Sequence, residues 1–288
     1  MKFNVTVALA VTKAERNIHS CLKSLLMQSI SDYEIVIVED PPFDRTKELV
    51  DAFGDRRIRY FRNEKWLGLS KSRNKCIDLA KGKYIFFTDD DCVVSKNWIE
   101  QGLKSFNKLD CIGVEGKTYY VSKQYKPTFS DHVIENKTGR QYHTCNIAYK
   151  KGVLEKIRGF DERFNYLEDR DLALRALKLG KICFNPEMVV YHKRSVMKPL
   201  QFVKMAKRIR NKVLLYKKSG EKVFTVWRIV NPTYLMAIIF PPLLLASFLN
   251  NTYRKKEDFI LFPFNYLKLI YERLNLWYMC IKERVFLI

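Results

Sequence analysis

Apolar and polar residues alternate with two different periods along the first half of the chain. In residues 5–11 the larger apolar side chains occupy every second position, which is the pattern of a strand. In residues 15–28 apolar side chains recur every three or four positions, which is the pattern of a helix. Further predicted strands cover residues 34–38, 58–61 and 84–88, and further predicted helices cover 46–53, 69–80 and 98–106. Strands and helices that alternate at this spacing predict an α/β domain with a largely parallel sheet.

The pattern is looser in the second half of the chain. After a polar stretch we predict strands at 146–149, 182–184 and 189–192, a helix at 168–179 and a basic helix at 200–218. Apolar and aromatic sequence follows the basic helix. The change predicts an α/β domain over residues 1–195 and a helical region over residues 196–288.

Composition narrows the class of protein. Of the 288 residues, 47% are hydrophobic and 14% aromatic, which suits a large hydrophobic core and excludes a disordered chain. The seven cysteines are scattered, with no C-x-x-C pair. Such a set indicates reduced thiols in a cytoplasmic protein rather than a disulfide scaffold or a zinc site.

Positive charge is concentrated in one segment. The formal net charge is +21, and the thirty residues from Lys193 to Lys222 hold eleven lysines and arginines against a single acid. A nucleic-acid binder could carry such a cluster. However, an uncharged run of seventeen residues, 233–249, follows, and basic residues beside an apolar run are typical of a cytoplasmic membrane flank. We therefore expect anionic membrane lipid as a partner, no nucleic acid, and a location on the cytoplasmic face of the cell membrane.

Three arrangements fit the apolar run at 233–249. A straight helix of this length would be about 25 Å long, slightly short of the roughly 30 Å hydrocarbon core of a bilayer. Pro241 and Pro242 would kink it, and a second basic cluster follows at Arg254. Two basic flanks favour a bent segment that enters and leaves on the cytoplasmic face, ahead of a single span or a buried soluble helix.

The chain ends in a predicted amphipathic helix, residues 264–281. Its polar residues recur every three or four positions and leave a wide apolar face, made of Tyr266, Leu267, Ile270, Leu274, Trp277 and Tyr278. Such a helix can lie in the membrane interface. A contact between two copies of the chain in a homo-oligomer is the alternative.

Carboxylates gather where predicted strands end. Glu39 and Asp40 follow the strand at 34–38, and Asp89, Asp90 and Asp91 follow the strand at 84–88. Ligands bind beyond the carboxyl ends of parallel strands, and three successive carboxylates repel one another unless a cation joins them. Oxygen ligands favour Mg²⁺ or Mn²⁺. The structural alternatives are a helix cap for the three aspartates and an ordinary turn for the pair.

A third acidic group, Glu168, Asp169 and Asp171, opens the predicted helix at 168–179. Acids cap helices, so this group also has a structural explanation. Its position after the turn at residues 159–162 favours a functional role.

Taken in order, these stretches resemble the family 2 glycosyltransferases, which have the GT-A fold. The matching segments lie within residues 5–192 and are Val7 to Ser29 with Asn17-Ile18, Glu34-Ile-Val-Ile-Val-Glu-Asp40, Gly68-Leu-Ser-Lys-Ser-Arg-Asn74, Gly82-Lys-Tyr-Ile-Phe-Phe-Thr-Asp-Asp-Asp-Cys92, Gly159-Phe-Asp-Glu162, Glu168-Asp-Arg-Asp-Leu172 and Val189-Val-Tyr-His192. The resemblance implies a Rossmann-like sheet with a nucleotide-sugar half over residues 1–121 and an acceptor half over residues 122–195.

The resemblance also implies roles for individual residues. Asp40, with Glu39 beside it, would bind the nucleotide base in a pocket that Arg73 also lines. The D-x-D motif would supply Asp91 as metal ligand and Asp89 as a contact to the ribose or an aid to the metal.

Two further roles come from the second half of the matching region. Asp169 would be the general base of an inverting enzyme. His192 falls where some GT-A enzymes supply another metal ligand, although a hydrogen bond to the backbone would explain it equally well.

Physical chemistry agrees with these roles. A divalent ion at Asp91 would stabilise a leaving diphosphate without a general acid, so one carboxylate remains to deprotonate the acceptor hydroxyl. One metal clamp and one base predict inversion at the anomeric carbon, whereas a glycosidase needs two carboxylates that flank the bond. We expect an inverting, Mn²⁺- or Mg²⁺-dependent transferase that uses a UDP-, GDP- or dTDP-sugar and a lipid-linked glycan or polyprenyl lipid as acceptor. The alternative is a catalytically degenerate GT-A protein that acts as a membrane-surface binding or scaffold module.

The chain departs from the family in three places. Ala10-Val11-Thr12-Lys13 stands where many members have Pro-Thr-Tyr-Asn, so the ring that stacks on the base is missing. Pro41-Pro42 replaces the usual Gly-Ser. No Gln-x-x-Arg-Trp motif follows Asp169, so nothing indicates a processive polymer synthase.

Overall fold

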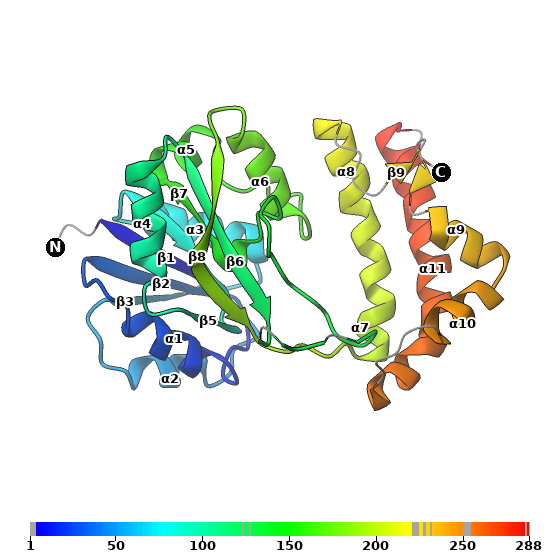
Figure 1. The fold of residues 1–288 in the computed structure, drawn as a ribbon, viewed down its shortest axis with the longest axis horizontal. Helices are drawn as coiled ribbons and strands as arrows, with labels where there is room; N and C mark the ends of the chain where they lie inside the picture. The colour runs from blue at the N-terminus through cyan, green and yellow to red at the C-terminus, as the bar shows by residue number, and fades with distance from the viewer. Residues whose placement is uncertain are drawn as a thin grey trace. The chain divides into compact units, whose positions relative to one another are not determined.

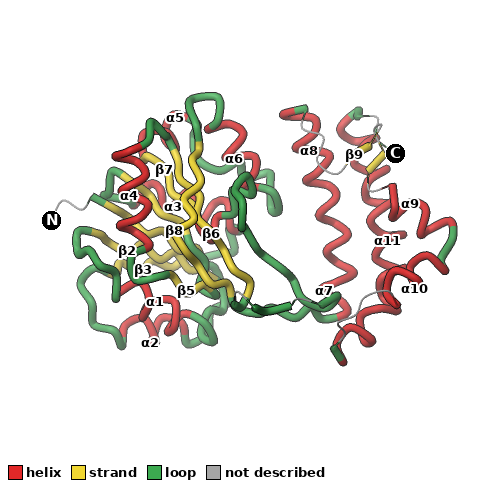
Figure 2. The backbone as a smooth tube through the Cα atoms, viewed as in Figure 1, coloured by secondary structure: helices red, strands yellow, loops and turns green. Residues whose placement is uncertain are grey.

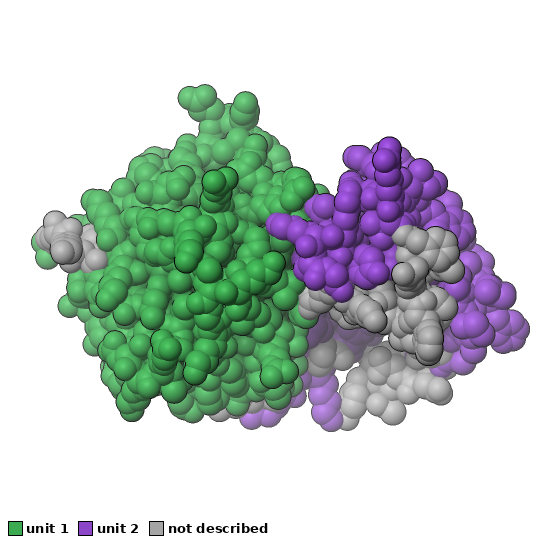
Figure 3. All heavy atoms as spheres, turned by 90° about the horizontal axis from the view of Figure 1, so that it is seen from above, with its two compact units in different colours: residues 1–123, 134–193 green, residues 124–133, 194–288 purple. Residues whose placement is uncertain are grey.

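The computed structural model describes residues 4–122, 124–126, 128–220, 225–226, 229–230, 232–249, 255–285 and 287. The chain divides into two compact units (Figure 3). Unit 1 comprises residues 1–123 and 134–193, and unit 2 comprises residues 124–133 and 194–288.

Unit 1 is built on one mixed eight-stranded sheet (Figure 1). Its strands are β1 (Val5–Val11), β2 (Tyr33–Glu39), β3 (Ile58–Arg62), β4 (Tyr84–Phe87), β5 (Cys92–Val94), β6 (Gly113–Tyr120), β7 (Ile147–Lys150) and β8 (Ile182–His192). They lie in the order β3-β2-β1-β4-β7-β6-β8-β5. The first four are parallel, and β7 runs antiparallel to both of its neighbours. The structure thus has the predicted α/β sheet, with its parallel part in the first half of the chain.

Helices cover both faces of this sheet (Figure 2). They are α1 (Ile18–Leu26), α2 (Thr46–Asp51), α3 (Leu69–Leu79), α4 (Trp98–Lys108), α5 (Lys151–Lys156) and α6 (Glu168–Ala176), with a 3₁₀ turn η1 (Thr144–Asn146). Residues of β1 alternate between two cores: Val7 and Leu9 face one core with α1 and α4, whereas Ala8 faces the other with α3 and α6. The sheet therefore forms the middle of three layers.

The two strands predicted at 182–184 and 189–192 are one strand, β8. It pairs with β6 in parallel, with a register shift between Gly116 and Lys117. At this irregularity a Cβ on Gly116 would lie 2.1 Å from the Met188 carbonyl oxygen, so the position requires glycine. Asn146 donates to the Met188 carbonyl (3.0 Å) and to the Lys117 carbonyl (3.0 Å), so one side chain holds the irregular pairing from both strands.

The sequence pattern did not predict β5, β6 or α5. β5 and α5 are short, and β6 contains two glycines in its sequence GVEGKTYY, which weakens the strand pattern. β5 matters for the site because it pairs with β8 in a register that sets Cys92 opposite His192. The residue that follows the third aspartate therefore lies beside the end of β8.

Unit 2 is mostly helical in its described residues. It contains α7 (Pro199–Lys204), η2 (Met205–Arg208), α8 (Ile209–Ser219), β9 (Thr225–Val226), β10 (Ile229–Val230), α9 (Pro232–Ile239), α10 (Pro242–Leu249) and α11 (Lys256–Glu283). The predicted basic helix corresponds to α7, η2 and α8, and the apolar run is broken into α9 and α10 at the two prolines. Within the described part of the chain, every helix is too short or too polar to cross a bilayer.

We expect Gly82→Ala to destabilise the protein by about 1–3 kcal/mol, the usual cost of overpacking. An added Cβ would lie 2.5 Å from the backbone nitrogen of Thr6 and from the backbone carbon of Val5, so β1 would have to shift. Urea unfolding followed by circular dichroism measures the loss. Gly152→Ala is the matched control: its Cβ would meet nothing within 4 Å in α5, so stability should rise by about 0.5–1 kcal/mol. Equal effects of the two changes would contradict the close approach at Gly82.

Candidate active site

Two of the predicted acidic groups, Asp40 and Asp89 to Asp91, lie at the carboxyl ends of neighbouring parallel strands. β1 lies between β2 and β4, and all three run in the same direction. Asp40 follows β2, and its backbone N–H donates to the carbonyl of Val11 at the end of β1 (2.9 Å). Asp89 to Asp91 follow β4. The sheet thus brings both predicted acidic clusters to one edge, where ligands of such folds bind.

Arg73, on α3, joins the aspartate cluster to the third acidic group. Its guanidinium donates to Asp89 Oδ1 (3.1 Å) through one nitrogen and to Glu168 Oε1 (2.7 Å) through another. The side chain is only 6% exposed, so these ion pairs are shielded from solvent. α6 begins at Glu168, which places Asp169 in its first turn. The structure therefore assembles Arg73, Asp89, Glu168 and Asp169 into one site.

The charges at this site act strongly on one another. Burial opposes the charged form of Arg73, but the carboxylates of Asp89, Glu168 and Asp169 raise the pKa of Arg73 above its ordinary value. Burial and the neighbouring charge of Glu168 raise the pKa of Asp169 to about 7, against the opposing effect of Arg73. Asp169 therefore takes up or releases a proton near neutral pH.

Asp171 contributes to α6 itself, because its carboxylate accepts from Arg175 one turn later (2.8 Å). The sequence analysis offered helix capping as the structural explanation of the third acidic group, but α6 has no hydrogen bond from a capping side chain. Asp171 instead stabilises the helix through an ion pair between successive turns.

Asp40 is buried, with 3% of its surface exposed. Its two carboxylate oxygens accept from the Asn63 side chain (2.7 Å) and the Gly68 backbone N–H (2.8 Å). Each carboxylate oxygen has two lone pairs, so both bonds leave acceptor capacity for a ligand. Asp40 also anchors the loop that leads into α3, the helix that carries Arg73.

Glu39 points away from Asp40 because successive side chains of a strand alternate. Its carboxylate accepts from Tyr60 and from Arg62 (2.9 Å) on the neighbouring strand β3. Burial, followed by the hydrogen bond to Glu39, raises the pKa of Tyr60. The contacts of Glu39 are therefore cross-strand contacts, and its predicted part in nucleotide binding stays a prediction.

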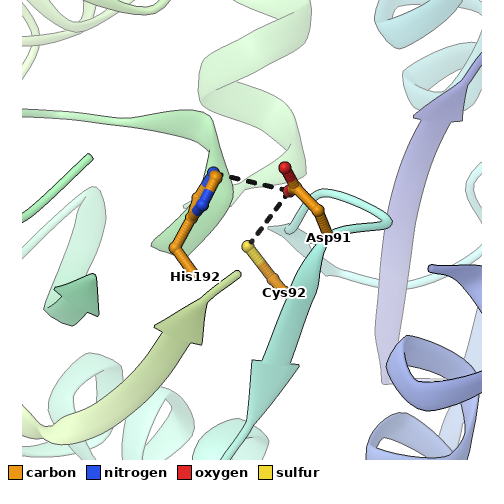
Figure 4. A group of neighbouring side chains, drawn as sticks. All are labelled: Asp91, Cys92 and His192. Atoms are coloured by element: carbon orange, nitrogen blue, oxygen red, sulfur yellow. Dashed lines mark hydrogen bonds and ion pairs between the residues drawn. The ribbon is translucent and has the colours of Figure 1, made fainter. Parts of the chain in front are cut away.

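Asp91 and His192 face each other across the β5–β8 pair (Figure 4). The His192 Nδ1 atom lies 2.9 Å from the Lys193 carbonyl oxygen, which can only accept, so Nδ1 carries the proton. In the neutral ring, Nε2 then presents a lone pair 3.4 Å from Asp91 Oδ1. Two ligands of one divalent ion lie roughly 3 Å apart, and metal-binding histidines commonly hold a backbone carbonyl through the other nitrogen. The pair therefore fits a divalent ion. The structure contains the predicted backbone contact of His192, and its role as a metal ligand stays a prediction.

Cys92 completes a group with Asp91 and His192 whose ligand atoms lie within 4.8 Å of one another (Figure 4). The sequence analysis named Asp91 and His192 as candidate ligands, and the structure adds the thiol of Cys92 to this group. Burial, followed by the nearby Cys145, raises the pKa of Cys92 well above its usual range. A neutral thiol is a weak metal ligand, so the group still favours a hard ion at Asp91.

Two side chains that the sequence analysis assigned no role support Asp90. Asn17 donates to Asp90 Oδ2 (3.5 Å) and accepts from Lys193 Nζ (3.3 Å). Burial, with the neighbouring charges of Asp91 and Asp89, raises the pKa of Asp90 to about 7. Lys193 follows His192 directly, so the end of β8 supplies both a candidate ligand and a lysine that holds Asn17.

His143 is the other residue that sequence reasoning missed. It precedes η1, which lies beside Asp89 because Thr88 Oγ1 donates to the Cys145 carbonyl (3.0 Å). Its Nδ1 atom is buried without a hydrogen-bond partner among the described residues, and burial lowers the pKa of His143 to about 4. A neutral, unpaired ring nitrogen at this edge can hydrogen-bond a bound ligand. The sequence offers one signal for His143: it stands shortly before β7, the strand that pairs with β4.

The family model for "Glycosyl transferase family 2" matches residues 6–161. The chain is 27% identical over 175 residues, 59% of this chain and 68% of the relative, to the UDP-Glc:alpha-D-GlcNAc-diphosphoundecaprenol beta-1,3-glucosyltransferase WfaP of Escherichia coli. It is 28% identical over 193 residues, 60% of this chain and 56% of the relative, to the uncharacterized glycosyltransferase EpsJ of Bacillus subtilis (strain 168). The chain thus spans about two thirds of the first relative and little more than half of the second.

Solved structures share the fold. TarS 1-349 of S. aureus in complex with UDP matches with a TM-score of 0.58 at 15% identity. This match covers 99% of the present chain and 93% of the TarS chain. The mannosyltransferase PcManGT from Pyrobaculum calidifontis in complex with GDP-Man and Mn²⁺ matches with a TM-score of 0.62 at 14% identity. This match covers 96% of the present chain and 88% of PcManGT. These likenesses confirm the predicted GT-A fold.

We expect Asp90→Asn to stabilise the metal-free protein at pH 8 and to have little effect at pH 4. The folded-state pKa of about 7 exceeds the ordinary 3.8, so the stability cost of ionising Asp90 appears as the pH rises from about 4 through 7. One pKa unit corresponds to about 1.4 kcal/mol, and partial exposure reduces the gain to about 1–3 kcal/mol. Urea unfolding in EDTA at both pH values measures it.

Asp55→Asn is the control of opposite sign. The hydrogen bond from Arg57 lowers the pKa of Asp55, so its stabilising effect is present above the ordinary pKa and is lost as the pH falls below it. This variant should lose stability at pH 8. A pH-independent effect of Asp90→Asn would show that Asp90 is not destabilised by its neighbours.

Proposed function

The chain belongs to glycosyl transferase family 2, and from that premise we propose an inverting, metal-assisted transfer of one sugar from a nucleotide-diphosphate sugar to an acceptor hydroxyl. The observation that carries the proposal is the Arg73 bridge between Asp89 and Glu168. It holds a strand-end aspartate cluster and a carboxylate of raised pKa, Asp169, in one site. Such a site can hold a donor at one end and activate an acceptor at the other.

Donor binding is assigned to the strand ends. Asp40 keeps acceptor capacity for an N–H of the nucleotide base. Asp91 and His192, assisted by Asp89, would hold a divalent ion, and that ion would stabilise negative charge on the leaving diphosphate. Asp90, with Asn17 and Lys193 behind it, orients this loop.

Asp169 is assigned the role of general base. A base is most effective when its pKa lies near the working pH, and burial with Glu168 raises the pKa of Asp169 to about 7. Its carboxylate also accepts from the Arg170 backbone N–H (2.7 Å), which orients it at the start of α6. Deprotonated Asp169 would take the proton of the acceptor hydroxyl as the oxygen attacks the anomeric carbon. With the leaving group on the opposite side of the sugar, this step inverts the configuration.

The related proteins guide the choice of substrates to test. The structures named above contain UDP or GDP-Man, which supports UDP- and GDP-sugars as first donors and leaves dTDP-sugars to be tested beside them. The name of the E. coli relative specifies a diphosphoundecaprenol acceptor. We therefore propose a lipid-linked acceptor, with Mn²⁺ or Mg²⁺ as the ion.

Purified protein should transfer or hydrolyse sugar from one donor of a UDP-, GDP- and dTDP-sugar panel in the presence of Mn²⁺ or Mg²⁺, and EDTA should abolish the activity. Asp91→Ala should abolish metal-dependent donor binding, because it removes a metal ligand. Asp169→Asn should keep donor binding and lower transfer about 10²- to 10⁴-fold, the usual contribution of a general base. Calorimetric donor titration and release of nucleoside diphosphate measure the two effects.

Glu162→Gln is the matched control, since Glu162 forms an exposed ion pair with Lys71 and should leave both effects unchanged. Wild-type turnover by Asp169→Asn would exclude Asp169 as the base. A complete lack of turnover with every donor and a lipid extract would favour a membrane-surface binding or scaffold module on this fold.

We further propose that unit 2 attaches the protein to the cytoplasmic face of the cell membrane. Its helices expose large apolar side chains, among them Met236, Ile239, Phe240, Leu243, Leu245, Leu267, Leu274, Trp277, Tyr278 and Ile281. On α11, Leu267, Leu274 and Ile281 recur every seven residues and are 55%, 54% and 81% exposed. Exposed apolar and aromatic residues in a basic helical region suit the interface of an anionic bilayer.

Leu274→Ser with Trp277→Ser should weaken binding to phosphatidylglycerol-containing vesicles at least tenfold, since each buried apolar side chain contributes about 1.5–3 kcal/mol. Wild-type protein should stay bound in 1 M NaCl, because burial of apolar area is not screened by salt. Vesicle flotation measures both. Leu109→Ser with Leu179→Ser, exposed positions of unit 1, is the matched control. If the first pair instead converts a dimer to a monomer in light scattering, α11 is a subunit interface.

A further inference from the structure

The loop that joins the end of β3 to the start of α3, residues 63–68, is fixed at both ends to one carboxylate. At its first residue, Asn63, the side-chain amide donates to Asp40 Oδ1 (2.7 Å). At its last residue, Gly68, the backbone N–H donates to Asp40 Oδ2 (2.8 Å). The whole loop is therefore held beside the residue that follows β2.

Further hydrogen bonds hold the first end of this loop. The Asn63 backbone N–H donates to the carbonyl of Glu39 (2.9 Å). The Asn63 side chain also donates to Ser72 Oγ (3.1 Å) and accepts from Lys75 Nζ (2.7 Å). Asn63 is itself buried. A buried polar network thus sets the position of the loop relative to Asp40.

Trp66 lies in the middle of the loop with a largely exposed side chain. Its surface is 60% exposed, although tryptophan is among the side chains that bury the most apolar area in folded proteins. Two residues of chain span at most about 7 Å, so Trp66 stays close to the Gly68 end of the loop. The loop therefore presents an uncovered aromatic ring near a buried carboxylate.

The indole of Trp66 lies beside Gly68. A Cβ added to Gly68 would lie 3.8 Å from Trp66 Nε1 and, apart from its two chain neighbours, would meet no other atom of the described residues within 4 Å. The φ angle of Gly68 is +87°, a conformation that residues with a side chain rarely adopt. Glycine at this position therefore directs its N–H to Asp40 and leaves open space beside the indole.

Trp66 differs from the groups that hydrogen-bond Asp40. The Asp40 backbone N–H donates to the Val11 carbonyl (2.9 Å), and Thr12 Oγ1 donates to the Asp40 carbonyl (3.2 Å). Neither of these residues carries a ring. A carboxylate can accept an N–H at the edge of a planar base, but it offers no contact to the face of that base. An aromatic ring beside the carboxylate supplies this second kind of contact.

We propose that Trp66 stacks on the base of the nucleotide donor while Asp40 binds the edge of the same base. This inference rests on the proposed function, which assigns Asp40 to the base, and it adds the residue that contacts the face. Every nucleobase has a π face, so stacking strengthens the binding of any base, whereas the hydrogen bond to Asp40 selects among bases. The fixed loop holds the ring near its binding position before the donor arrives, which lowers the entropic cost of binding.

Full-length protein with Mg²⁺ should bind at least one of UDP, GDP and dTDP in calorimetric titration. Trp66→Leu should weaken binding of that nucleotide about 5- to 100-fold, because it removes a base–aromatic contact and keeps an apolar side chain. Trp66→Phe should retain most of the affinity, because it keeps a ring. Inorganic pyrophosphate has no base, so Trp66→Leu should bind it like wild type.

Met27→Ala is the matched control, because Met27 is also an exposed apolar residue of unit 1. It ends α1, which leads from the end of β1 back to the start of the parallel strand β2, so Met27 lies at the opposite edge of the sheet from Asp40. Its nucleotide affinity should equal that of wild type. The unfolding midpoint of each variant reports whether it folds.

Tryptophan fluorescence gives a second measurement. Saturation with the nucleotide should quench the fluorescence of wild type more than that of Trp66→Phe. Equal nucleotide affinity of wild type and Trp66→Leu, or an equal loss of pyrophosphate binding in Trp66→Leu, would overturn this inference and leave the transferase proposal intact. A wild type that binds none of the three nucleoside diphosphates would overturn the transferase proposal and this inference with it.

Discussion

The buried guanidinium of Arg73 is the interaction on which the active site depends. Asp89, Glu168 and Asp169 would repel one another at the edge of the sheet, and Arg73 supplies the positive charge between them. Because the guanidinium is planar and carries donors on separate nitrogens, it bonds Asp89 and Glu168 at once. A lysine could not bridge the two in this fixed geometry. The site therefore consists of residues from α3, the end of β4 and the start of α6, held by one side chain.

The second constraint is the pairing of β5 with β8 at the far edge of the sheet. This pairing determines that Asp91 meets His192 and that Lys193 approaches Asn17. Both contacts depend on the irregular β6–β8 register, because the register shift determines which residues stand at the end of β8 beside β5. Asn146 and Gly116 stabilise that register. A change at either position would move the candidate metal ligand without touching it.

Unit 2 is built on a different balance of forces. Its helices share a small hydrophobic core and leave many large apolar side chains exposed, which is costly in water unless a lipid surface or a protein covers them. Its charges are mostly positive, and its few described acids are used in specific contacts such as the Asp131 pairs with Arg194 and Lys255. Excess positive charge and exposed apolar area favour the same kind of partner, one with a negative surface and an apolar interior.

The sequence by itself determined the local elements and the positions of the chemistry along the chain. Hydrophobic periodicity placed β1 to β4 with their helices, because burial on both sheet faces leaves a strong pattern in the residues themselves. It also placed Asp40 and Asp89 to Asp91 at strand ends. The sequence pattern did not predict β5, which is short, or β6, which contains two glycines. It also did not show that β8 is continuous, because its pairing with β6 has an irregular register.

Only the tertiary structure decided which of these residues meet. Arg73 contacts Glu168 across 95 residues, and Lys193 contacts Asn17 across 176, distances over which sequence pattern carries no register. The same holds for His143, whose neighbours are set by the pairing of β7 with β4. The sequence determines which chemical groups the side chains carry, whereas the electrostatic environment of each group results from packing between distant segments.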